Sequence, residues 1–281
     1  MVAVFDPFKI TEPTCIGFSG GRTSAYMLWR VLQSNGGLPK ECIVTFQNTG
    51  KEEEATLKFI KDCEDNWGTK IHWIERVFDD VGFKIVNYET ASRNGEPFEA
   101  LVRKYKILPN PVARNCTGQL KIRAQAFFVK SLGIFPNESY AAIEKFGWVG
   151  IRKDEERRAA KIADKSRIPL WMAGVTKEMI GDFWKTQSFD LGLPNHNGVT
   201  MHGNCDLCFL KPMPQILSLI AERPERAVFW VKIESLKLSA EPSGSVFRID
   251  RPNYAQMLNF SQEQRDMFDP NEEAIACFCG D

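Results

Sequence analysis

A glycine-rich turn between an apolar run and a helical pattern is the feature that most constrains this fold. The apolar residues 15–18 are followed by Gly20 and Gly21, and a helical pattern then covers residues 25–32. Glycine allows positive φ and close approach of a ligand to the backbone, and the free N–H groups at a helix N-terminus attract anions. We therefore expect a strand, an anion-binding turn and a helix, with a ligand-free turn and helix cap as the structural alternative.

The same order of elements recurs along the chain. A β-branched run at 43–46 precedes a helical pattern at 52–63, and residues 70–77 and 146–151 are predicted as further strands. Strands that alternate with helices predict an α/β fold with a doubly wound, mostly parallel sheet. The alternation fades near Ile168. We accordingly expect an α/β domain at 1–167, which carries the anion-binding turn, and a C-terminal, cysteine-bearing subdomain at 168–281.

Composition narrows the class of protein. The chain has 281 residues, 43% of them hydrophobic, with 36 Lys and Arg against 36 Asp and Glu. No run approaches the roughly 18 apolar residues that span a bilayer, so we expect a soluble cytoplasmic protein without a membrane partner. The balanced charge provides no overall positive field to recruit nucleic acid. Eight cysteines in such a chain favour metal or redox chemistry over a disulfide framework.

The predicted ligand contacts follow the predicted strands. In doubly wound sheets, ligands bind beyond the carboxyl ends of the strands. Arg152 is favoured as an anion ligand because a planar guanidinium can hold an oxyanion with two hydrogen bonds. The expected nucleotide-binding residues are Ser19, Gly20, Gly21, Arg22, Thr23, Ser24, Asn48, Thr49, Gly50 and Arg152.

The first turn resembles the S-G-G-x-[DT]-S pyrophosphate loop of adenine-nucleotide α-hydrolase-like (PP-loop ATP pyrophosphatase) enzymes. These include tRNA thiolases and sulfonucleotide reductases. Many members carry Asp where this chain has Thr23. The departure removes a carboxylate that helps to hold a metal ion, which puts magnesium-dependent cleavage of ATP in doubt.

Further segments are similar to phosphoadenosine phosphosulfate (PAPS) reductase-like proteins. Residues 150–158 resemble the signature G-x-R-x-x-[ED]-[SE]-x-R, whose arginines meet phosphate or sulfate groups and in which Arg152 would also serve the reaction. The connecting segments 95–98, 108–111, 114–117 and 120–121 match in order, as do residues 169–184. The resemblance runs from about Cys15 to Lys211, and it implies a HUP-type fold that binds ATP or PAPS.

The cysteines indicate the chemistry. Cys205 and Cys208 form a C-x-x-C pair, a spacing that suits one metal centre, a redox pair or two core thiols. In the iron–sulfur members of the resembled family, a Cys-Cys pair joins a later C-x-x-C to hold a [4Fe–4S] cluster. Here the pair reads Asn115-Cys116, so the resemblance implies the ligands Cys116, Cys205 and Cys208, with zinc as the alternative metal.

The fourth ligand and the attacking thiol are left open by the sequence. Cys277, Cys279, His202 or an exogenous group would complete the metal set. PAPS reductases carry a nucleophilic cysteine on a C-terminal tail, and Cys277 and Cys279 resemble it in location. The apolar surroundings of the remaining cysteines predict buried core residues: Cys15, Cys42 and Cys63.

The resemblance implies an oxidoreductase or a sulfurtransferase. It would act as a sulfonucleotide reductase with a thiol reductant such as thioredoxin, or as an ATP-dependent thiolase with a sulfur donor and a nucleic-acid substrate. A homo-oligomer is compatible with either activity. The alternative from another class is a non-enzymatic, zinc-containing regulator or nucleic-acid-binding protein, with Thr23 marking a lost metal site.

Overall fold

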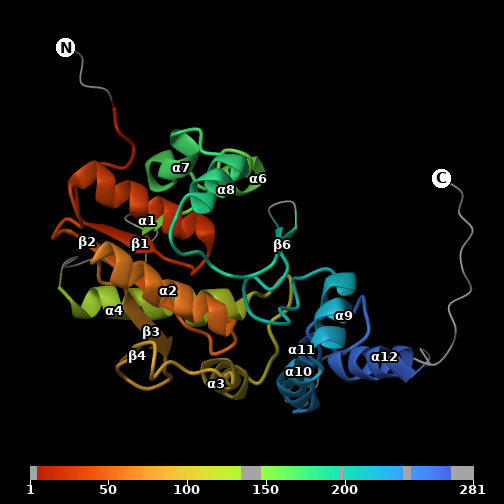
Figure 1. The fold of residues 1–281 in the computed structure, drawn as a ribbon. Coiled ribbons are helices and arrows are strands. Elements are labelled where there is room, and N and C mark those ends of the chain that lie inside the picture. The colour runs from red at the N-terminus through yellow and green to blue at the C-terminus, as the bar shows by residue number, and fades with distance from the viewer. Residues whose placement is uncertain (1–4, 134–146, 197–198, 237–241, 267–281) are drawn as a thin grey trace, which may run out of the picture.

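A five-stranded sheet forms the centre of the molecule (Figure 1). The computed structural model describes residues 5–133, 147–196, 199–236 and 242–266. The strand order is β4-β3-β2-β1-β5, in which β1, β2, β3 and β5 are parallel and β4 is antiparallel to β3. The strands are β1 (Thr14–Gly17), β2 (Cys42–Gln47), β3 (His72–Arg76), β4 (Phe83–Val86) and β5 (Gly147–Val149), and a separate hairpin pairs β6 (Asn195–His196) with β7 (Val199–Thr200).

Helices follow most of these strands. Two helical segments are not α-helices: η1 (Cys116–Arg123) is a π-helix and η2 (Lys165–Arg167) is a 3₁₀-helix. The helices of the first two thirds are α1 (Arg22–Asn35), α2 (Glu54–Trp67), α3 (Glu96–Tyr105), α4 (Ala124–Ser131), α6 (Glu156–Ala159), α7 (Pro169–Met172) and α8 (Lys177–Lys185). The last part contains α9 (Met213–Glu222), α10 (Glu225–Ser235), α11 (Pro242–Ser245) and α12 (Tyr254–Asp266).

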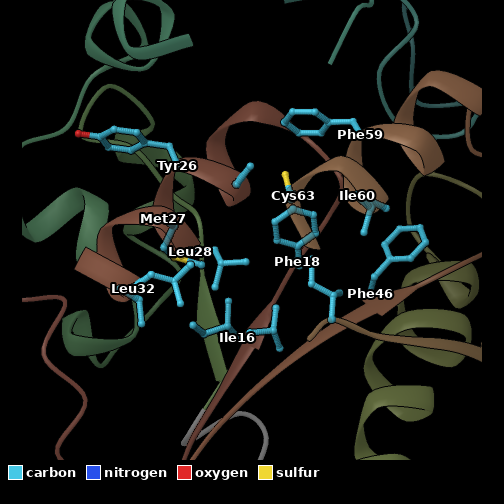
Figure 2. Packing of buried hydrophobic residues seen from close by; sticks show 14 of the residues in the cluster. Ile16, Phe18, Tyr26, Met27, Leu28, Leu32, Phe46, Phe59, Ile60 and Cys63 are labelled. Carbon is cyan, nitrogen blue, oxygen red and sulfur yellow. The ribbon is translucent and has the colours of Figure 1, made fainter. Parts of the chain in front are cut away.

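The sheet is covered on both faces. Figure 2 shows side chains of α1 and α2 over the sheet, with Leu28 near Ile16 of β1 and Ile60 near Phe46 of β2. The opposite face packs against α4 in a second cluster. This arrangement is a three-layer α/β architecture, compatible with a Rossmann-like fold. The predicted α/β class with a mostly parallel sheet is confirmed at this level.

The predicted core cysteines lie where expected. Cys15, Cys42 and Cys63 are buried in the clusters on the two faces of the sheet. Burial raises the pKa of Cys15 to about 11 and that of Cys42 to about 12, because a thiolate is poorly solvated there. These thiols are packing residues.

A second hydrophobic core lies beside the sheet domain. Trp230, Phe247 and Tyr254 of the C-terminal helices pack with Phe98 of α3 and Leu120 of η1. Conversely, the sheet core includes side chains from α7 and α8 and the segment that follows them: Leu170, Val175, Ile180, Trp184 and Leu191. The two cores therefore do not divide at the expected domain boundary of 167/168, since each contains residues from both sides of it.

The charged residues after β5 pair differently from what their spacing along the chain predicts. Asp154 and Arg158 have the i,i+4 spacing of a helical ion pair but are not paired in the described structure; Arg158 contacts Glu155, and Asp154 binds Arg152 at 2.8 Å. The segment 156–159 is too short a helix to place Asp154 and Arg158 on one face. No helix of the described residues is long and apolar enough to cross a membrane.

Candidate functional site

The loop from Ser19 to Ser24 connects β1 to α1 as the sequence predicts. Ser24 Oγ donates to the carbonyl of Gly21 at 2.9 Å and accepts from the backbone N–H of Ser19 at 3.2 Å. The hydroxyls of Ser19 and Ser24 lie 3.0 Å apart. No side chain caps the N-terminus of α1. The first N–H groups of α1 are therefore left to a ligand or solvent.

The two glycines of this loop have different structural roles. Gly20 has φ +75°, and a Cβ there would lie 2.6 Å from Cγ2 of Thr56, so the fold itself requires glycine. Gly21 has φ −103° and ψ 159°, a conformation open to any residue. A Cβ on Gly21 would meet only Ser19 Oγ, at 3.7 Å. Packing therefore does not explain why residue 21 is a glycine. The missing side chain leaves space beside the loop.

Arg152 reaches this loop from the neighbouring strand. It follows β5, which pairs with β1 on the side opposite β2, so the two loops flank the point where the strand order reverses. Arg152 Nη1 lies 3.3 Å from the hydroxyl of Thr23. A Cβ on Gly150 would lie 3.4 Å from Cα of Ser24, which shows how closely the segments approach. Such a switch point is the usual ligand site of doubly wound sheets.

Both arginines at this site have carboxylate partners. Arg152 Nε donates to Asp154 at 3.0 Å, and Arg22 Nε donates to Asp190 at 2.6 Å. Burial opposes the charge of Arg152, but Asp154 and Glu155 more than offset it, so the pKa of Arg152 is raised. Arg22 also has a buried Nη1 without a hydrogen-bond partner in the described structure. The site thus holds two permanent cations beside a helix N-terminus.

The second predicted loop lies in a different environment. Asn48 is fully buried and donates to Glu75 at 2.6 Å and to the carbonyl of Ser92 at 2.8 Å. Gly50 has φ +78°, and a Cβ there would lie 3.0 Å from the backbone of Gly95. Asn48, Thr49 and Gly50 are therefore tied into internal contacts, and their expected role in nucleotide binding stays a prediction.

This loop instead meets the C-x-x-C segment. Glu52 forms an antiparallel bridge with Cys205, and the N–H of Asp206 donates to the carbonyl of Lys51 at 2.8 Å. Lys51 and Asp206 form a buried salt bridge of 2.9 Å. Trp230 donates to the other carboxylate oxygen of Asp206 at 2.8 Å. The loop after β2 thus anchors the cysteine pair against the second core.

The three predicted cysteine ligands interact electrostatically with Lys121. Burial raises the pKa of Cys116, and burial together with Glu52 raises that of Cys205. Burial disfavours the charged form of Lys121, but electrostatic attraction to Glu52 and the three cysteines favours it more strongly. The pKa of Lys121 is therefore raised. Thr49 Oγ1 donates to Glu52 at 2.9 Å and lies 3.4 Å from Cys205 Sγ. Lys121 is itself half-buried.

The described residues do not form a complete metal site. Within the described ranges, no group of three or more His, Cys, Asp or Glu side chains is arranged to hold a metal ion. His202, a candidate fourth ligand, has Nδ1 at 3.1 Å from Arg226 and Nε2 at 3.2 Å from Glu222. The assignment of Cys116, Cys205 and Cys208 as metal ligands therefore stays a prediction. Cys277 and Cys279 lie outside the described residues.

Sequence reasoning missed the residues that join the predicted loops to segments far away in the sequence. Lys51, Asp206 and Asp190 were not singled out, because each has its partner far away in the sequence. In the sequence, Glu52 stands out only as the start of the predicted helix at 52–63. Its spacing from Thr49 indicates the local hydrogen bond, but only the tertiary structure places it beside Cys205.

Fold and site together define an α/β protein with a candidate anion site at the switch point of its sheet. The chain is 28% identical over 217 residues to an uncharacterized protein of the nin region of Escherichia phage lambda, covering 72% of this chain and 67% of the relative. It is 31% identical over 154 residues to an uncharacterized protein of Methanocaldococcus jannaschii, covering 54% of this chain but only 26% of that relative. No family model and no solved structure matches the chain.

Proposed function

We propose that this protein is an enzyme of the PAPS reductase-like type, within the adenine-nucleotide α-hydrolase-like fold. It would bind the phosphates of ATP or PAPS at Ser19–Ser24 and carry out sulfur transfer or reduction with its cysteines. The observation that supports this best is the approach of Arg152 to Thr23, at 3.3 Å across the switch point. An anion there would meet helix N–H groups, two hydroxyls and two guanidinium groups.

Gly21 supports the proposal independently. A residue that neither packing nor backbone conformation requires to be glycine is explained when a ligand occupies the space beside it. A phosphate group needs such close access to backbone N–H groups. Ser19 and Ser24 provide the neighbouring hydroxyl donors.

Two routes are consistent with this site. In the reductase route a cysteine thiolate attacks the sulfonate sulfur of PAPS, the S–O bond breaks, and adenosine 3′,5′-bisphosphate leaves the sulfonate on the cysteine. A dithiol reductant then displaces sulfite and restores the cysteine, while its own two thiols become a disulfide. In the thiolase route a substrate oxygen attacks the α-phosphate of ATP and pyrophosphate leaves. A sulfur nucleophile then displaces AMP. Both routes need an anion site and a nucleophilic thiol. Magnesium, if used, would be held without the carboxylate that Thr23 replaces.

The proposed nucleotide site is tested with Gly21→Val. The variant places a side chain in the ligand space while its φ and ψ remain allowed, so we expect an unchanged melting temperature and loss of ATP and PAPS binding in calorimetry. Gly181→Val is the control, because a Cβ at Gly181 in α8 meets nothing within 4 Å.

Two results would contradict the proposal. Unchanged affinity of Gly21→Val for both nucleotides would exclude the loop as the phosphate site. Wild-type protein that binds neither nucleotide, and that is purified without oxygen as a colourless protein with one zinc per chain, would favour the non-enzymatic regulator.

A further inference from the structure

One segment of this electrically balanced chain contains cations only. Residues 100–133 include seven of the 36 Lys and Arg residues and none of the 36 Asp and Glu residues. The segment begins within α3, continues through η1 and ends after α4 (Figure 1). The rest of the chain therefore carries a net negative charge, so the positive charge is concentrated in this region.

Most of these cations are available to a partner. Arg103 is paired with Glu99, and Lys121 faces Glu52 and the thiols. Four others are exposed and form no ion pair with any residue in the described part of the chain: Lys104, Lys106, Arg114 and Lys130. Unpaired exposed cations at this density favour an extended polyanion over a single small anion.

Exposed apolar side chains alternate with the cations. Tyr105, Ile107 and Ile122 are each more than one third exposed, and Val112 is 95% exposed. Val112 lies in a turn that Asn110 closes by accepting from the N–H groups of Val112 and Ala113. Basic side chains interleaved with exposed aromatic and aliphatic ones are typical of surfaces that bind a sugar–phosphate backbone and unpaired bases.

The same segment leads into the cysteine site. Cys116 opens η1, a π-helix of eight residues, and Lys121 of that helix faces Cys116, Cys205 and Cys208. π-Helical turns are rare and occur frequently at functional sites. A polyanion bound along residues 103–123 would thus lie beside the thiols.

We propose that the exposed face of residues 103–123 binds the phosphodiester backbone of a nucleic acid. This inference deepens the proposed function, on which it rests for the chemistry: the acceptor at the cysteine site is a nucleic acid and not a free sulfonucleotide. Binding by this face involves neither the loop Ser19–Ser24 nor Arg152, so the two proposals can be tested separately.

The test measures fluorescence anisotropy of labelled single-stranded DNA, single-stranded RNA and a folded RNA hairpin against salt concentration. The variant Lys106→Gln/Arg114→Gln removes two unpaired cations and should leave the fold unchanged. We expect affinity at low salt to fall about tenfold and the slope of log K against log salt to fall by about 2 in magnitude. The three oligonucleotides distinguish DNA from RNA and unpaired from paired bases.

The matched control is Lys40→Gln/Lys70→Gln. These two cations are also exposed and form no ion pair within the described ranges. They precede β2 and β3 and so lie at the amino ends of these strands, whereas the loop that meets the cysteine pair follows the carboxyl end of β2. We expect the control to bind like the wild type. Equal losses in both double variants would show nonspecific charge attraction and overturn the proposal, as would wild-type protein that binds anionic phospholipid vesicles but no oligonucleotide.

Failure of this proposal is distinguishable from failure of the proposed function. Calorimetry with ATP on Lys106→Gln/Arg114→Gln should give wild-type affinity, because neither residue lies in the nucleotide loop. Binding of oligonucleotides without binding of ATP or PAPS would contradict the proposed enzyme and support nucleic-acid binding by residues 103–123. Binding of ATP or PAPS without binding of oligonucleotides would support the nucleotide site and contradict nucleic-acid binding by this face.

Discussion

Two glycines at the switch point differ in what requires them to be glycine. Gly20 and Gly21 are adjacent, yet only Gly20 is constrained by positive φ and by contact with Thr56. Arg152 is similarly defined by its neighbours, since Asp154 orients it and Thr23 lies 3.3 Å from its Nη1. A guanidinium held in this way would be oriented for the proposed oxyanion before the ligand binds.

The residue-scale prediction concerns Arg152. Arg152→Ala removes a charge-assisted hydrogen bond to the ligand, which contributes about 1.5–3 kcal/mol, so we expect the Kd for ATP or PAPS to rise by about 10- to 150-fold. Calorimetry measures the change. Arg158→Ala is the control, because Arg158 is an exposed arginine that also contacts Glu155. An equal loss in both variants would show that only the general positive charge matters.

At the scale of elements, the loop after β2 and the C-x-x-C segment behave as one unit. The backbone bridge between Glu52 and Cys205 aligns them, and the salt bridge between Lys51 and Asp206 closes the interface. Phe229 adds a cation–π contact, with Lys51 Nζ 4.8 Å from its ring centroid. The cysteine pair therefore depends on a loop that precedes it by about 150 residues.

The element-scale prediction is that Asp206→Ala destabilises the protein strongly. It would leave Lys51 buried without its anion and Trp230 without a hydrogen-bond acceptor, so we expect the free energy of unfolding to fall by about 3 kcal/mol. Denaturant unfolding gives this value. Asp62→Ala breaks the exposed pair with Lys58 and should leave the midpoint nearly unchanged. A small loss in Asp206→Ala would mean that the buried pair contributes little.

At the scale of the whole molecule, each of the two hydrophobic cores contains residues from before and after residue 167. Leu170 and Trp184 from beyond residue 167 complete the sheet core, whereas Phe98 and Leu120 from before it complete the second core. A chain that passes three times between two cores cannot unfold one of them without exposing apolar surface in the other.

The corresponding prediction concerns a fragment. Residues 1–167 alone should lack a cooperative thermal transition, because the fragment exposes the face that α8 covers and the side chains of α3. The full chain should show one transition by both circular dichroism and calorimetry. Cooperative unfolding of the fragment near the melting temperature of the full chain would support an independent domain that ends at residue 167.

The sequence by itself determined the local structure. The apolar run before Gly20, the turn and the following helical pattern predicted β1, the loop and α1 to within a few residues. The buried run at Cys42–Gln47 and the positions of the three core cysteines were likewise predictable. These features depend on the periodicity of apolar residues and on glycine conformation, which neighbouring residues determine.

Only the tertiary structure decided which of the predicted loops meet. It placed Arg152 at Thr23, whereas it placed Thr49 and Glu52 beside Cys205 and gave Arg22 its partner Asp190. It also brought Lys121 into electrostatic interaction with the thiols and left Lys104, Lys106 and Arg114 exposed. The physical reason is that strand order and buried ion pairs join residues far apart in the chain, and the cost or gain of each pair depends on burial that no local pattern encodes.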